Sequence, residues 1–370
     1  MVYILSFLLS IGSLTSLISD YLVYITLMLF VIVSLFNRRI INNIIANFHF
    51  IYPLIIVLIL LLVNTIVNDS VYVEGVSINY KFIATIFLFL FLRSFFIIYP
   101  KSVHYSLLFY AIGVMFLVML YNSNLVAGEL EFRNNRLIFF GENPNSLSTR
   151  IGLGVILLFW FFKEETFFKR KMYKYVFLIP LPFCILMMID TASKGSVLIL
   201  LASIVLLFIF SNITVFKKII VLFVIGVALV YLFPLFIDTG LYERFKSNSL
   251  LTGRNEIWLA AWDIFLNNPL GVGEAGYRSE IVIRLNKIID THNVFLYLLV
   301  TGGFFAAMSY SVFLFKILKI QLAIFRFNKK PLFLIIFVFL LFLMSKTGGV
   351  LTYLVMWYFL AIISMEKKII

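Results

Sequence analysis

The chain has 370 residues, of which 63% are hydrophobic, 18% aromatic and only 13% charged. This composition excludes a soluble domain with an ordinary polar surface, because such domains carry about 25% charged residues. Lys and Arg outnumber Asp and Glu by 30 to 17, which gives a formal net charge of +13. The composition predicts an all-α polytopic membrane protein that forms a single integral membrane domain, residues 1–370.

Apolar runs separated by polar breaks extend along the whole chain. Because a bilayer core of about 30 Å needs about 20 helical residues, these breaks predict about twelve spans, and the short first and last pairs leave about ten or eleven open. They lie near residues 2–18, 21–36, 48–67, 80–99, 103–121, 145–162, 174–190, 195–211, 217–237, 291–315, 330–345 and 348–364. The first run lacks the positive start and cleavage site of a secretory signal. We therefore expect it to remain as a span.

Basic residues in the short connectors predict the orientation of the chain, since cytoplasmic loops carry an excess of Lys and Arg. With both termini cytoplasmic, the inner connectors hold Arg38, Arg39, Lys101, Lys163, the cluster 169–174, Lys217, Lys218, the run 316–330, Lys367 and Lys368. Most acidic residues then fall outside, in residues 68–79, 122–144 and 238–290. The positive charge is thus a topology signal with a weaker attraction to anionic lipid, and we expect no nucleic-acid partner.

Residues 238–290 are the longest polar interruption and predict a large extracytoplasmic loop, with 122–144 as a second one. Within it, residues 255–267 have helical periodicity and predict an amphipathic helix on the bilayer surface, where Trp258 and Trp262 share a face. Arg254 stands at the first turn of this helix, where backbone N–H groups and a guanidinium favour an anion. The alternative is a loop arginine that reaches lipid headgroups.

Two glycines follow this helix, in the turn from Asn268 to Gly273. Gly271 and Gly273 either close a turn after Pro269 or let the backbone approach a phosphate. No Lys-Ser/Thr pair follows them, so the spacing excludes a P-loop.

His292 lies among Asp290, Thr291 and Asn293 at the start of a long apolar run. At a helix start the dipole disfavours a protonated ring, so a neutral imidazole would be available to take a proton from a hydroxyl nucleophile. The alternative is that His292 only caps the helix. Outside the membrane no nucleotide sugar is at hand, and a lipid-linked diphosphate is the expected donor for any transfer there.

The order of these motifs resembles the signature region of the O-antigen polymerase and ligase superfamily, whose members include polysaccharide polymerases, O-antigen ligases and bacterial protein O-oligosaccharyltransferases. The residues that carry the resemblance are Thr252-Gly253-Arg254, Ile257-Trp258, Asn268 to Gly273, His292-Asn293 and Gly303. Thr191 to Ser196 is similar to the family's Ser-Arg-Gly turn, with Lys194 in place of arginine, and Asn143 to Ser146 is similar to its Pro-Asn element. The resemblance covers about residues 140 to 310, and Ala306 stands where the family often has glycine.

The resemblance implies a GT-C-like glycosyltransferase architecture and inverting glycosyl transfer that needs neither metal nor cofactor. The donor would be an undecaprenyl-diphosphate-linked oligosaccharide on the outer face of the bacterial inner membrane. It assigns catalysis to His292, which would activate the acceptor hydroxyl, and to Arg254, which would neutralise the diphosphate. The substrate-binding residues would be Arg150, Lys194, Arg278, Arg284, Asn145, Trp258 and Asp290.

Within the superfamily we favour a polysaccharide polymerase, which joins lipid-linked repeat units and can work with a chain-length regulator. The expectation of no soluble domain after the last span and the richness in Phe, Ile, Leu and Asn support this choice. An O-antigen ligase that transfers the glycan to lipid A core is the first alternative. A flippase for the same lipid is the alternative from another class, against which the sequence shows no internal repeat and a large one-sided loop.

Overall fold

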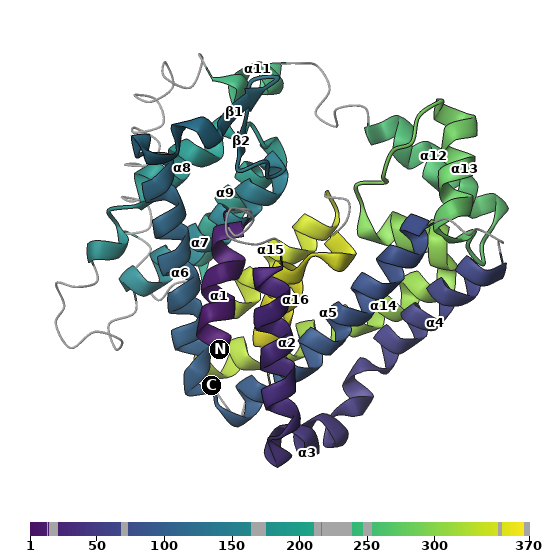
Figure 1. Ribbon diagram of the computed structural model, residues 1–370, viewed down its shortest axis with the longest axis horizontal. Coiled ribbons are helices and arrows are strands. Elements are labelled where there is room, and N and C mark those ends of the chain that lie inside the picture. The colour runs from purple at the N-terminus through teal and green to yellow at the C-terminus, as the bar shows by residue number, and fades with distance from the viewer. Residues whose placement is uncertain are drawn as a thin grey trace. The chain divides into compact units, whose positions relative to one another are not determined.

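Helices make up most of the chain in the computed structural model (Figure 1), which describes residues 1–12, 14, 21–67, 73–163, 175–210, 216, 239–246, 254–346 and 350–365. The α-helices are α1 Val2–Ile11, α2 Leu22–Leu35, α3 Arg38–Ala46, α4 Tyr52–Val67, α5 Val73–Ile98, α6 Lys101–Tyr121, α7 Pro144–Lys163, α8 Leu181–Asp190, α9 Lys194–Ile209, α11 Gly240–Lys246, α12 Arg254–Asn267, α13 Gly273–Leu285, α14 Val294–Asn328, α15 Leu332–Met344 and α16 Leu354–Ile363. The 3₁₀-helices are η2 Phe48–Ile51, η3 Asn124–Glu129 and η5 Val350–Thr352. This architecture is consistent with a polytopic membrane protein.

The predicted spans contain helices wherever the structure describes them, and the span predicted at 217–237 lies wholly outside the described residues. By length and apolar composition, five of the described helices can cross a membrane, or six if α2 and α3 form one span bent by 90°. The apolar helices α1, α8, α9, α15 and α16 are shorter than a full crossing. Twelve spans therefore stay a prediction.

A β-hairpin in the 122–144 loop corrects the expectation that all regular structure is helical. Its strands are β1 Leu130–Arg133 and β2 Arg136–Phe139, paired antiparallel with Leu130 opposite Phe139. The two turn residues, Asn134 and Asn135, both have positive φ, which is the backbone of a tight type I′ turn. In β2, Leu137 and Phe139 are buried while their neighbours are partly exposed, so the hairpin packs one face onto the helices.

The chain divides into two compact units, each built from separate stretches of sequence. The first comprises Met1–Ile32, Pro100–Asn248 and Phe327–Phe339. In it α1 packs along α6, and α7 packs against α6, α8 and α9. The close approach of α1 to α6 depends on Gly113, because a Cβ atom there would collide with the side chain of Ser10.

The second unit comprises Val33–Tyr99, Ser249–Arg326 and Leu340–Ile370. Its core is aromatic, with the ring of Phe313 in contact with those of Phe89 and Trp357. Arg93 is buried here, lies 4.2 Å over the ring of Phe50 and donates to the carbonyl oxygen of Ser364 at 3.3 Å. Because Ser364 follows α16, this guanidinium satisfies a carbonyl group at the C-terminal end of that helix.

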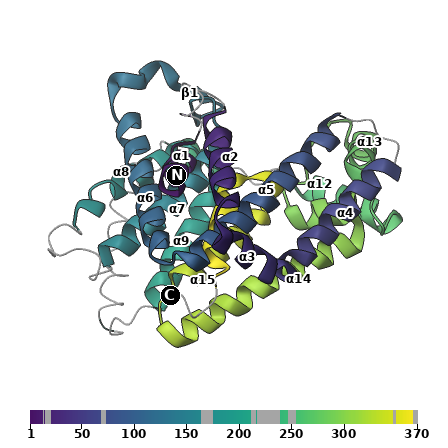
Figure 2. The same ribbon diagram turned by 60° about the horizontal axis from the view of Figure 1, so that its bottom comes forward.

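Helix α4 runs antiparallel to α14 in both views (Figure 2). The hydroxyl of Ser309 donates to the carbonyl oxygen of Pro53 at one end, and Asn64 contacts Thr301 at the other. Helices α12 and α13 form an adjoining hairpin whose core is built by Ala261, Ile264, Val272, Tyr277 and Ile281 together with Val300 of α14. The predicted helix at 255–267 is therefore confirmed as α12, with Ala261 and Ile264 buried against α13 and α14, and its place on the bilayer surface stays a prediction.

Helix α14 is broken at Gly303, where φ is 77° and ψ is −179°. The turn that joins α12 to α13 fits into this break. The amide of Val272 donates to the carbonyl oxygen of Val300 at 2.8 Å, and the amide of Phe304 donates to the carbonyl oxygen of Pro269 at 2.9 Å. The side-chain amide of Asn64 donates to the carbonyl oxygens of Leu270 (2.9 Å) and Thr301 (3.0 Å). These bonds satisfy backbone groups that the break releases.

The close fit explains both glycines in the turn, since a Cβ atom on Gly273, which has φ of 70°, would lie 2.8 Å from the carbonyl oxygen of Asn64. A Cβ atom on Gly271, which has φ of 90°, would collide with the amide of Gly303. Of the two readings left open by the sequence, the structure supports the one in which this turn closes against protein backbone.

Candidate functional site

The loop that precedes α14 is held by its own side chains. Oδ1 of Asp290 accepts hydrogen bonds from the Thr291 hydroxyl at 3.2 Å and from the His292 amide at 3.4 Å. The side-chain oxygen of Asn293 accepts from the amides of Phe295 at 2.9 Å and Leu296 at 3.2 Å. Asn293 is therefore the N-cap of α14, and the alternative in which His292 caps the helix is wrong.

His292 adopts the left-handed backbone conformation, with φ of 51°. Such a conformation is uncommon for residues other than glycine and asparagine, and it often marks functional sites. Helix α12 supports the loop from the side, because Nε1 of Trp258 donates a 2.9 Å hydrogen bond to the carbonyl oxygen of Thr291. The two tryptophans of α12 thus differ in their surroundings: Trp258 is hydrogen-bonded to the loop, whereas Trp262 is 45% exposed.

The imidazole of His292 is partly buried between opposite charges. Burial lowers its pKa below the ordinary value, the Asp290 carboxylate acts to raise it, and the Arg254 guanidinium lowers it further. The net effect is a lowered pKa, so the ring is neutral at pH 7 and can accept a proton. Arg254, at the start of α12, is thus within electrostatic reach of His292, and the structure brings these two predicted residues together.

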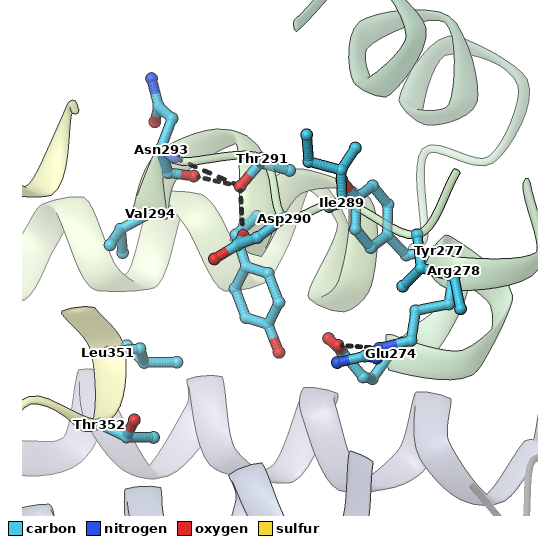
Figure 3. A pocket seen from close by; sticks show the side chains of 12 residues that line it. Glu274, Tyr277, Arg278, Ile289, Asp290, Thr291, Asn293, Val294, Leu351 and Thr352 are labelled. Atoms are coloured by element: carbon cyan, nitrogen blue, oxygen red, sulfur yellow. Dashed lines mark hydrogen bonds and ion pairs between the residues drawn. The ribbon is translucent and has the colours of Figure 1, made fainter. Parts of the chain in front are cut away.

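A cavity of about 260 Å³ opens beside this loop (Figure 3). Its described lining residues are Glu274, Tyr277, Arg278, Ile288, Ile289, Asp290, Thr291, Asn293, Val294, Tyr297, Leu351 and Thr352. They come from α13, from the loop before α14, from α14 itself and from η5. Three of them, Asp290, Thr291 and Asn293, flank His292 in the sequence.

Glu274 and Arg278 form an ion pair on the α13 side of the cavity, with Oε1 of the carboxylate 2.9 Å from Nε of the guanidinium. Next to them the hydroxyl of Tyr277 donates to the carbonyl oxygen of Ile289 at 2.8 Å. Burial, followed by the carboxylates of Asp290 and Glu274, raises the pKa of Tyr277. This phenol therefore stays protonated and keeps its hydrogen bond to the loop.

Arg284, in the last turn of α13, forms ion pairs with carboxylates of both helices of the α12–α13 hairpin. Its guanidinium is 3.0 Å from Oδ2 of Asp263 and is also paired with Glu280. The hydrogen bond to Glu280 raises the pKa of Arg284, so this charge is committed to the two carboxylates. A role of Arg284 in substrate binding stays a prediction that would require it to exchange these partners.

The first unit brings other predicted residues together around the turn between α8 and α9. Oδ1 of Asn145 accepts from Nη2 of Arg136 at 2.8 Å and from the Ser193 hydroxyl at 3.0 Å. Lys194, the first residue of α9, is only 8% exposed, and its Nζ lies 5.5 Å from the ring centre of Phe245. Of the expected turn from Thr191 to Ser196, only Thr191 to Ser193 lie between the helices, because α9 already begins at Lys194. Asn145 and Lys194 belong to the same cluster.

Two cations of this cluster escaped the sequence reasoning. Nε of Arg136 donates to the carbonyl oxygen of Thr191 at 3.2 Å, and Nη1 of Arg244 donates to that of Ala192 at 2.6 Å. Arg136 begins the unexpected strand β2 and Arg244 belongs to the short helix α11. Both lie in the two predicted outer loops, 122–144 and 238–290, but neither lies in a recognisable motif.

Arg150 forms a buried ion pair with Glu142. The two side chains are 8% and 6% exposed, and Nη2 of Arg150 lies 2.7 Å from Oε1 of Glu142. A Cβ atom on Gly12 would collide with this guanidinium, so α1 ends directly against the pair. A phosphate would have to compete with the carboxylate for Arg150, and its role in substrate binding stays a prediction.

The comparisons with known proteins bear on the region that contains both sets of residues. Residues 175–311 match the family model described as O-antigen ligase. This match supports membership of the O-antigen polymerase and ligase superfamily, which confirms the resemblance found in the sequence. The matched segment includes Lys194, Arg254, Asp290 and His292. No curated protein matches the chain.

The match supports an enzyme of the O-antigen polymerase and ligase type, because members of this family are glycosyltransferase-like. Members of the family use lipid-linked oligosaccharide substrates and contact membrane lipid. The family is bacterial and membrane-bound, and the apolar helices of this chain are consistent with a membrane protein.

Proposed function

We propose that the protein is a polysaccharide polymerase, which transfers a growing glycan from undecaprenyl diphosphate to a sugar hydroxyl of a second lipid-linked repeat unit. The observation that carries the proposal is the placement of His292, whose neutral imidazole lies within electrostatic reach of Asp290 and Arg254. A proton acceptor next to a guanidinium is what glycosyl transfer from a diphosphate requires.

In the proposed reaction, the oxygen of the acceptor hydroxyl forms a bond to the anomeric carbon of the donor sugar. The bond between that carbon and the diphosphate oxygen breaks, and the diphosphate leaves with the electron pair. Attack opposite the leaving group inverts the anomeric centre. The hydroxyl proton passes to His292, and Asp290 stabilises the imidazolium that forms, since its carboxylate favours the charged ring.

The diphosphate is already a good leaving group, so the protein has to hold its charge rather than protonate it. Arg254 is the cation proposed to neutralise the diphosphate. It lies at the start of α12, where helix amides also favour an anion. Lys194, Asn145, Arg150, Arg278 and Arg284 are proposed to support substrate binding, and Trp258 is proposed to hold the loop of His292. No metal or cofactor enters this reaction.

An O-antigen ligase is the second candidate, because the matching family model carries that description. Both enzymes would use the same donor and the same base, and they differ in the acceptor. We favour the polymerase because one class of substrate, the lipid-linked repeat unit, then serves as donor and acceptor.

Reconstitution tests this proposal. Purified protein in proteoliposomes without an ion gradient receives a polyprenyl-diphosphate-linked repeat unit, and the products are separated by length. Chain growth is the expected result. Transfer only after addition of lipid A core would identify a ligase, whereas translocation of the lipid without chain growth would identify a flippase.

The proposed setting is the inner membrane, with about twelve spans, a GT-C-like architecture, cytoplasmic termini and a site on the outer face, where a chain-length regulator would act. Labelling of single cysteines in intact cells tests the orientation in a Cys184→Ala background. A membrane-impermeant maleimide should label Asp263→Cys, on the exposed face of α12, and should leave Lys319→Cys on α14 unlabelled. The opposite pattern would place the site in the cytoplasm.

A further inference from the structure

The cavity beside His292 has a composition that suits a sugar better than a phosphate. Two carboxylates, Glu274 and Asp290, line it together with one guanidinium, that of Arg278. Arg278 is already paired with Glu274, so the lining keeps an excess of negative charge. A diphosphate would be repelled from such a lining, whereas hydroxyl groups can donate hydrogen bonds to the carboxylates.

We propose that this cavity binds one pyranose ring of the acceptor glycan, with Glu274 as the residue that accepts a hydrogen bond from a ring hydroxyl. The assignment to the acceptor rests on the proposed function. It divides the site into a carboxylate side, which binds the nucleophilic sugar, and a guanidinium side around Arg254, which binds the diphosphate.

The size of the cavity agrees with this ligand. Sites for drug-sized molecules have volumes of about 300–1,000 Å³, and this one has about 260 Å³. A single ring with its substituents fits such a volume, and a long glycan does not. The cavity also has an apolar surface, against which the face of a pyranose ring can pack. It is formed by the rings of Tyr277 and Tyr297 and by the side chains of Ile289 and Leu351.

The carboxylate of Glu274 is buried at the wall of the cavity. The side chain is 8% exposed, and Oε1 is occupied by Arg278. Oε2 is buried and receives no hydrogen bond of good geometry from the described residues, although the Tyr297 hydroxyl lies beside the same carboxylate. Because a buried carboxylate oxygen needs a donor, a ligand hydroxyl would complete this site.

The cavity lies beside the loop that carries His292, the proposed base. Asp290, Thr291 and Asn293 contribute to its wall, so a ring bound there lies next to the backbone that carries His292. Figure 3 shows Asp290 and Thr291 above the open space, Glu274 and Arg278 on one side of it, and Leu351 and Thr352 on the other. One hydroxyl bound by Glu274 and Asp290 would set the orientation of the ring toward the loop.

Binding of simple sugars tests the cavity without any need for turnover. Saturation-transfer NMR on the full-length protein in detergent would use methyl pyranosides of gluco, galacto, manno, rhamno and 2-acetamido-2-deoxy-gluco configuration. At least one should bind the wild-type protein. Glu274→Gln, which removes a charge-assisted hydrogen bond, should weaken that binding about tenfold or more. Thr352→Trp, which fills the cavity, should abolish it.

Asp263→Asn is the matched control, because it changes a carboxylate to an amide on the exposed face of the same hairpin, where Asp263 pairs with Arg284. It should bind the sugar as the wild type does. The proposal is wrong if no pyranoside binds the wild type, if Thr352→Trp binds as well as the wild type, or if Asp263→Asn weakens binding as much as Glu274→Gln.

The glycan-forming assay separates this proposal from the proposed function. If the wild type makes glycan while Glu274→Gln and Thr352→Trp keep both its rate and its sugar binding, the cavity assignment fails alone. If both variants lose sugar binding and the wild type makes no glycan, the cavity stands and the proposed function fails.

Discussion

The indole of Trp258 donates a 2.9 Å hydrogen bond to the carbonyl oxygen of Thr291, the residue that directly precedes His292. Trp258 stands four residues after Arg254 on α12, so both side chains project from the same face of that helix. One helix therefore supports the backbone next to the base and carries the guanidinium that acts on it.

Replacement of Trp258 by Phe tests this support. The change keeps most of the ring but removes the donor, so the Thr291 carbonyl loses its partner, which costs about 1–3 kcal/mol when the group is buried. We expect a lower thermal stability and a reduced turnover number. Trp262→Phe, a change at an exposed ring on the same helix, is the control and should alter neither quantity. Equal turnover in both variants would show that the bond does not position the site.

The pH dependence of activity should follow the charges around His292. Its pKa is lowered by burial and by Arg254, so the neutral ring persists below the ordinary value of about 6.5. Activity should fall only as the pH drops through this lowered pKa. Arg254→Gln removes a neighbouring positive charge, so the pKa of His292 should rise and the acid limb should move to higher pH.

Asp290→Asn should have the opposite effect, because it removes the carboxylate that favours the protonated ring. The acid limb should then move to lower pH. The pKa of the ring can also be followed by NMR titration in a variant with His49 and His104 replaced, which does not depend on turnover. Shifts of the same sign in the two variants would contradict the arrangement of charges.

The break in α14 predicts an unusual sensitivity at Gly303. A Cβ atom there would collide with the Leu270 carbonyl, and the backbone has φ of 77°. Strained backbone of this kind costs about 1–3 kcal/mol, to which the collision adds. Gly303→Ala should therefore lower the melting temperature and the activity clearly. Gly128→Ala, where a Cβ atom meets nothing within 4 Å, should leave both unchanged. Normal stability of Gly303→Ala would rule out the close fit of the turn.

The parts of this structure that local sequence determines could be predicted. The helix α12 follows from its apolar spacing, whereas the elements at Asn143 to Ser146 and Thr191 to Ser196, where α7 and α9 begin, were expected from the family resemblance. That Arg254 acts electrostatically on His292 agrees with their common place in the family resemblance. Each of these depends on a few consecutive residues or on a known motif.

Contacts between distant segments could not be predicted. Asn64 lies in α4, 206 residues before Leu270 and 237 before Thr301, and it holds the turn of the α12–α13 hairpin against the broken helix. A single asparagine in an apolar run gives no sign of its partners. The same holds for Glu142, a loop carboxylate in the sequence that proves to be the buried partner of Arg150.

The buried pair of Glu142 and Arg150 gives a further prediction. Removal of one member of a buried ion pair costs about 3–5 kcal/mol, because the other charge stays in a poorly solvated site. Glu142→Gln should thus lower the stability of the purified protein markedly, and Glu142→Leu with Arg150→Met should restore much of it. Thermal unfolding in detergent measures both. If Glu142→Gln were as stable as the wild type, the ion pair would not stabilise the fold, and this prediction would be wrong.

The most direct test of the account is the rate at which His292→Gln forms glycan from a polyprenyl-diphosphate-linked repeat unit. A positioned general base contributes about 10²–10⁴-fold to a rate, so the variant should lose at least about a hundredfold in turnover while it keeps the expression and melting temperature of the wild type. Turnover equal to that of the wild type would show that His292 does not activate the acceptor, and the proposed mechanism would be wrong.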